Sequence, residues 1–66
     1  MELLILKTGI DYIRIKDDGP IAVRMDKASV FPISRMEHVR RLEKDVIAAG
    51  FKDVRIKKLL LTEEDL

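Results

Sequence analysis

The sequence predicts a small α+β domain in which one α-helix packs on one face of a three- or four-stranded mixed sheet. Three observations predict this fold. Apolar and polar residues alternate in residues 12–16 and 21–26, apolar residues recur at helical spacing between residues 34 and 50, and alternation returns at residue 54. The element order is therefore strand, strand, strand, helix, strand, within a single domain of residues 1–66.

The first expected strand covers residues 1–7. Its four apolar residues, at positions 3–6, fall on both faces, which is typical of a central strand that is covered on both sides. The turn at residues 8–9 follows, because glycine accepts a positive φ without steric cost.

The second and third expected strands, residues 12–16 and 21–26, form a hairpin around an Asp-Asp-Gly-Pro sequence. A two-residue loop of Asp18 and Gly19 would require an amide hydrogen that Pro20 lacks. A loop of three or five residues would place Ile15 opposite Val23 and keep one apolar face. We therefore expect the wider loop.

The expected helix follows an irregular extension of the third strand, residues 27–31, which ends before Pro32. Ser34 and Glu37 have the spacing of a capping box, and Gly50 is placed to end the helix in a left-handed conformation. The apolar face of the helix consists of Val39, Leu42, Val46 and Ala49.

The last expected strand covers residues 54–62, and residues 63–66 form an acidic tail. A right-handed crossover from the third strand through the helix would place this strand beside the first strand and parallel to it. The predicted sheet order is third, second, first, last.

Composition narrows the classes of function. The chain has 66 residues, 47% of them hydrophobic but only 5% aromatic, a net charge of +1, one histidine and no cysteine. Disulfides, thiolate metal sites and a structural zinc site are therefore excluded, we expect no cofactor, and the core must be aliphatic. The longest apolar run near the N-terminus is too short to cross a membrane, so a cytoplasmic protein without a membrane partner is expected.

Candidate catalytic and metal-binding residues are few. His38 has no nucleophile or acid at a spacing that predicts a hydrogen bond, which favours an ordinary half-exposed helix residue. The acidic residues at 17–18 and 63–65 lack the ligand spacing of a calcium loop. We therefore expect a protein that is not an enzyme.

An unpaired apolar face is the main functional prediction. One helix covers one face of the sheet, yet both faces carry leucines. A second copy of the chain, in a homodimer, or another protein would then cover the face away from the helix. The expected interface residues are Leu4, Leu6, Leu59 and Leu61.

Nucleic-acid binding is the alternative prediction. Basic residues outnumber acidic ones between positions 34 and 58, and such residues attract phosphates. The small net charge and the lack of exposed aromatic residues argue against it. Its candidate contacts are Arg40, Arg41, Lys44, Arg55 and Lys57.

The chain also resembles small bacterial and phage-type proteins that have no assigned activity. The resemblance rests on Tyr12-Ile13, the Lys-Ala-Ser-Val-Phe stretch at 27–31, the helix, Gly50-Phe51 and the closing strand. It implies an α+β fold and carries over no activity.

Overall fold

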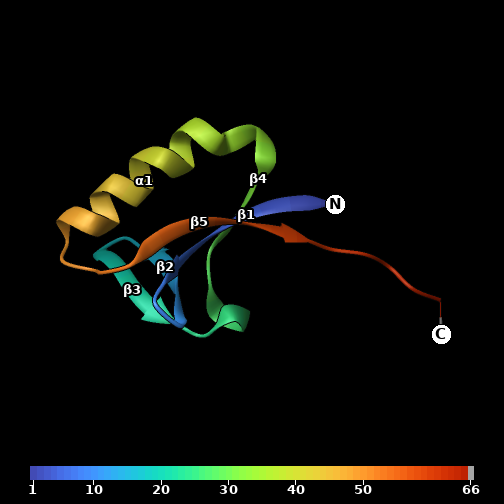
Figure 1. Ribbon diagram of the computed structural model, residues 1–66, viewed down its shortest axis with the longest axis horizontal. Coiled ribbons are helices and arrows are strands. Elements are labelled where there is room, and N and C mark those ends of the chain that lie inside the picture. The colour runs from blue at the N-terminus through green and yellow to red at the C-terminus, as the bar shows by residue number, and fades with distance from the viewer. Residues whose placement is uncertain (66) are drawn as a thin grey trace.

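The computed structural model describes residues 1–65, which form five β-strands, each antiparallel to its neighbours, and one α-helix lying over one face of the sheet (Figure 1). Leu66, the last residue of the expected acidic tail, lies outside the described residues. The predicted α+β class with one helix on a sheet is therefore confirmed. The elements are β1 (Glu2–Thr8), β2 (Asp11–Lys16), β3 (Gly19–Val23), η1 (Met25–Lys27), β4 (Val30–Pro32), η2 (Ile33–Arg35), α1 (Met36–Ala48) and β5 (Val54–Leu60).

Strand β1 is the centre of the sheet. It pairs along its whole length with β5 on one side. On its other side it pairs with β2 only near the connecting turn, through Lys7 with Tyr12 and Thr8 with Asp11, and with β4 at its opposite end. The predicted neighbours, with the last strand beside the first, are confirmed.

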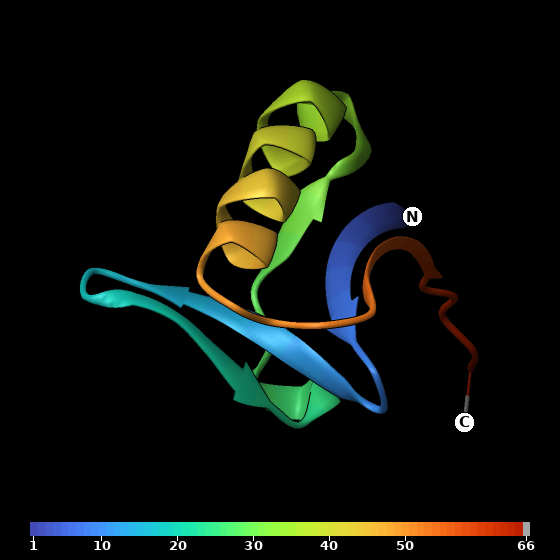
Figure 2. The same ribbon diagram turned by 60° about the vertical axis from the view of Figure 1, so that its left-hand side comes forward.

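The last strand runs antiparallel to β1, so the predicted parallel pair and mixed sheet are wrong. The stretch expected to be an irregular extension contains a separate short strand, β4, which is also antiparallel to β1. A strand–helix–strand crossover returns a strand parallel to the one it leaves. Because the crossover leaves β4, β4 and β5 point the same way on opposite sides of β1. Figure 2 shows β4 leading from beside the hairpin to the start of α1.

The β2–β3 loop is shorter than predicted. Lys16 pairs with Gly19 and Ile15 with Pro20, which leaves two residues in the connection. Ser29 bonds to β2 at Ile13 and Ile15, so their backbone groups point away from β3. The pair of Ile15 with Pro20 therefore needs no proline N–H. The loop consists of Asp17 and Asp18 rather than Asp18 and Gly19, and the predicted pairing of Ile15 with Val23 is wrong.

The core lies between α1 and the sheet, and it is aliphatic as predicted. Leu4, Leu6 and Ile13 of the sheet are buried against Val39 and Val46 of the helix. Partly buried side chains surround this cluster: Ile15, Phe31, Met36, Leu42, Phe51, Val54 and Ile56. Ala49, expected on the apolar face, is exposed. Ile5 is buried on the opposite face of the sheet, the side where η1 lies (Figure 1).

The predicted cap at the start of α1 is wrong, whereas the predicted end of the helix is right. The helix is preceded by the η2 turn, Arg35 occupies the cap position, and no side-chain hydrogen bond caps it, so the capping box is wrong. The C-terminus is confirmed. Gly50 has a φ of +103°, its N–H donates to the carbonyl of Ile47, and the N–H of Phe51 donates to that of Val46. These two bonds form a Schellman motif.

Candidate functional site

Two surface features are candidates for binding, and the first is an apolar patch on the sheet face away from α1. Residues paired across an antiparallel ladder share a face. Leu3 pairs with Leu59 and with Pro32, and all three lie on the face opposite Leu4. The apolar patch consists of Met1, Leu3, Val30, Pro32, Leu59 and Leu61.

Strands β5, β1 and β4 all contribute to the apolar patch, near the N-terminal end of β1. Met1 is 82% exposed, Val30 47% and Leu61 46%, while Leu3 and Leu59 are half-buried. Met1 and Leu61 exchange backbone hydrogen bonds of 3.0 and 2.9 Å, so the ladder continues to the edge of the patch. The end of the sheet is therefore ordered but only partly covered by its own chain.

The structure divides the four predicted interface residues. Leu59 and Leu61 lie together in the apolar patch. Leu4 and Leu6 are each 1% exposed and lie under the helix, so they are not available to a partner. The two faces of β1 could not be assigned from the sequence, because both carry aliphatic residues. Val30 and Pro32 were missed because β4 was not predicted.

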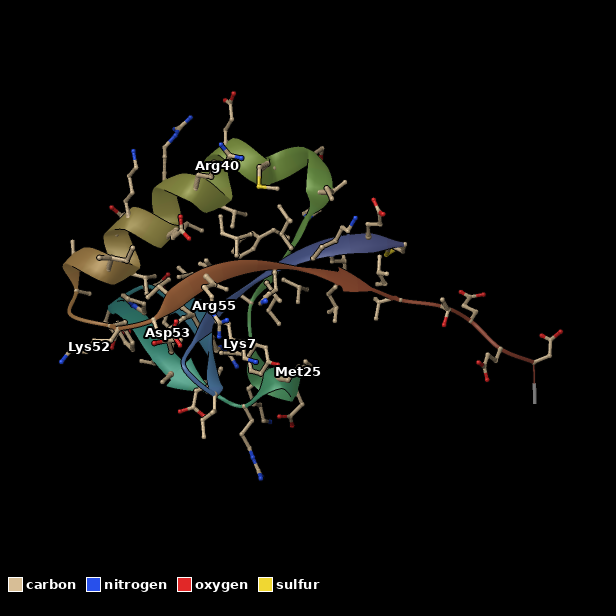
Figure 3. All side chains as sticks on the ribbon, in the orientation of Figure 1. Lys7, Met25, Arg40, Lys52, Asp53 and Arg55 are labelled. Atoms are coloured by element: carbon tan, nitrogen blue, oxygen red, sulfur yellow. The ribbon has the colours of Figure 1, made fainter. Side chains whose placement is uncertain are left out.

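The second feature is a hollow of about 600 Å³ between α1 and β5, which we call the basic groove. Four of the five predicted nucleic-acid contacts meet there. Arg41 is exposed on α1 outside the lining. Figure 3 shows Arg40 on the helix and Arg55 on the neighbouring strand. The groove is lined by Arg40, Glu43, Lys44, Arg55, Ile56 and Lys57.

The positive charge of Arg55 is partly offset by a neighbouring carboxylate. Its Nε lies 3.5 Å from Oδ1 of Asp53, and both side chains are about half exposed. Lys7, its cross-strand neighbour, has its Nζ 5.3 Å from the centre of the Tyr12 ring. A carboxylate and a cation–π contact thus offset two like charges on adjacent strands. Figure 3 labels Lys7, Asp53 and Arg55.

His38 lies exposed on α1, where its ring meets Phe31 edge to face, with centroids 5.9 Å apart and planes at 70°. This contact joins the first turn of the helix to β4. Within residues 1–65, no three His, Cys, Asp or Glu side chains are grouped to hold a metal ion. In that same part of the chain, no helix has the length and apolar character needed to span a bilayer.

Comparisons with protein families, with curated proteins and with solved structures found no match for this chain. The resemblance to small bacterial and phage-type proteins therefore stays a prediction, as does nucleic-acid binding by the basic residues.

Proposed function

We propose that this chain is a non-enzymatic protein-interaction module that self-associates through the apolar patch. One observation supports the proposal above the others. Six apolar residues share one face of the sheet, four of them in β1, β4 and β5 and two, Met1 and Leu61, in the next pair of the β1–β5 ladder, and the chain itself leaves Met1, Val30 and Leu61 exposed. Contiguous apolar surface of this kind is typical of a protein–protein contact.

A two-fold axis through the apolar patch would bury the same residues on both copies. Each Leu or Val side chain that passes from water to a fully buried position contributes about 1.5–3 kcal/mol. Stability of that size matters for a domain of 66 residues, whose single core supplies only about 3–5 kcal/mol. The side chains of the patch carry no ionisable group, so a role in a buried protein–protein contact is favoured over a catalytic role.

Light scattering on the purified protein tests the proposal. We expect the mass of a dimer for the wild type and of a monomer for Val30→Lys and Leu61→Lys, because each variant brings an ammonium into an apolar contact. Both positions are about half exposed, so the monomer tolerates the change.

The matched control is Ile10→Lys. Ile10 is 91% exposed in the β1–β2 turn, at the other end of β1 from the patch, and its replacement makes the same chemical change. This variant should remain dimeric. A wild type that stays monomeric at high concentration, or patch variants that stay dimeric, would contradict self-association through the patch.

A further inference from the structure

We propose that the free edge of β5, together with the basic groove beside it, binds an extended acidic segment of another protein by strand addition. In this mode of recognition a peptide pairs with an open sheet edge, and charged side chains beside the edge select it. This site lies along the outer edge of β5, where residues of α1 and β5 meet. Arg55 and Lys57 belong to the same sheet face as the apolar patch, but no groove residue is part of the patch, so the site does not depend on self-association.

The backbone of β5 supplies the first argument. Met1 exchanges hydrogen bonds with Leu61, and the N–H of Gly9 donates to the carbonyl of Asp53 at 3.2 Å. Bonded and non-bonded pairs alternate along an antiparallel ladder, so odd-numbered residues of β5 turn their backbone groups toward β1. The backbone groups that point to the free edge belong to Val54, Ile56, Lys58 and Leu60.

That edge is open in the part of the chain that the structure describes. Among residues 1–65, β5 pairs with β1 alone. In Figure 1, β5 crosses in front of β1 and no other element lies in front of it. An incoming strand would therefore find the outward N–H and C=O groups of β5 without a competing strand of the same chain.

Charge supplies the second argument. The basic groove holds four cations and one carboxylate, a formal excess of three positive charges. Within residues 1–65, ion pairs engage Arg55 and Lys58. Arg40, Lys44 and Lys57 take part in none of them, so they are available to carboxylates of a bound segment.

The same features disfavour two other occupants. A second copy of β5, paired antiparallel over most of its length, would bring Lys57, Lys58 or Arg55 opposite another cation, which destabilises a strand pair. Nucleic acid would not pair with the alternating N–H and C=O groups of the edge as a strand does, and it would meet Glu43 in the groove. Tyr12, Phe31 and Phe51, which could stack on bases, are half-buried, and the exposed ring of His38 packs edge to face on Phe31.

Three labelled hexapeptides separate strand pairing from charge in a fluorescence anisotropy titration. The first alternates glutamate with valine and should bind. The second replaces glutamate with lysine, so it keeps the strand preference and reverses the charge. The third replaces valine with proline, so it keeps the charge and loses the backbone donors. We expect the second and third to bind at least about tenfold more weakly than the first.

Variants locate the site. Arg40→Glu and Lys44→Glu should each weaken binding of the first peptide by about tenfold or more. Lys16→Glu, at the exposed tip of the β2–β3 hairpin, makes a like change of charge and should leave binding unchanged. Leu60→Pro removes one outward N–H at an edge position without changing the charge, and it should also weaken binding.

Amide chemical shifts provide the structural readout. Binding should move the N–H signals of Val54, Ile56 and Lys58 more than those of β3, the other long edge strand. If the glutamate–proline peptide bound as tightly as the glutamate–valine peptide, charge by itself would explain the binding, and strand addition would be overturned. Tighter binding of single-stranded DNA, lost in the Arg40 and Lys44 variants, would assign the groove to nucleic acid instead. No binding of the glutamate–valine peptide would also overturn the proposal.

Discussion

The hydroxyl oxygen of Ser29 accepts a hydrogen bond of 2.9 Å from the backbone N–H of Ile15. The N–H of Ser29 in turn donates to the carbonyl of Ile13 at 3.1 Å. The next three residues, β4, pair with β1. Residues 29–32 therefore bridge β2 and β1 beyond the point where these two strands stop pairing with each other.

Replacing Ser29 should destabilise the domain. Ser29→Ala leaves the N–H of Ile15 without its partner in a partly buried position, and we expect a loss of about 1–2 kcal/mol in the free energy of unfolding. Ser34→Ala is the control, because Ser34 is exposed in the η2 turn and forms no helix cap. Urea denaturation measures both. Equal losses in the two variants would contradict the role given to Ser29.

The end of α1 should depend on the backbone conformation of Gly50. Its φ of +103° is unfavourable for any residue with a Cβ, while a Cβ built there meets no atom within 4 Å. The cost of Gly50→Ala is therefore conformational, and we expect it to be about 1–2 kcal/mol. Gly50→Asn should cost less, because asparagine tolerates positive φ better than alanine. Thermal or urea unfolding that ranks alanine at or above asparagine would contradict this account.

Asp53 has a φ of +52° in the loop that leads into β5. Its backbone carbonyl accepts from Gly9, so this conformation also ties the loop to the β1–β2 turn. We expect Asp53→Ala to lower the free energy of unfolding by about 1 kcal/mol, since alanine is strained at this φ. Asp53→Gly should be less damaging. Both variants lose the exposed ion pair with Arg55, so the difference between them reports the backbone alone.

The buried and exposed faces of α1 should respond differently to truncation. Val46 is fully buried against the sheet, and Val46→Ala should cost about 1–3 kcal/mol through lost apolar contact and a small cavity. Ile47 is 52% exposed, and Ile47→Ala should change stability by less than about 0.5 kcal/mol. Chemical denaturation of the two neighbours provides the comparison. A larger loss at Ile47 would indicate that another chain covers that side of the helix.

Self-association through the apolar patch should link stability to protein concentration. A folded dimer that dissociates on unfolding has a Tm that rises with concentration by mass action. We expect this rise in the wild type and its absence in Val30→Lys. Calorimetry over a wide concentration range measures both proteins. A Tm of the wild type that does not change with concentration would contradict the dimer.

Much of the fold could be predicted because its signals are local. The end of α1 at Gly50 depends on one glycine and the residues around it, and both bonds of the motif are present. The failures depend on distant parts of the chain. Whether Leu3 or Leu4 faces the helix is decided by packing, because both are equally apolar. β4 has only three residues, too few for alternation to mark it.

The candidate sites were also predictable only as far as their signals are local in the sequence. Charge is visible in the sequence, so four groove residues were identified, although their meeting depends on how α1 lies over β5. The apolar patch needs the register of three strands. Without β4, nothing in the sequence connects Val30 or Pro32 with Leu59.

The place of β1 in the sheet has a consequence for folding during synthesis. Its pairing is completed by β5, and the bond between Met1 and Leu61 joins residues that are 60 positions apart. While the ribosome is still making the helix, the leucines of β1 have no strand on that side. The pairing of β1 is therefore complete only once β5 is available, and a partly folded chain in which β5 has not yet docked presents an apolar strand with an unpaired edge, which is prone to aggregation.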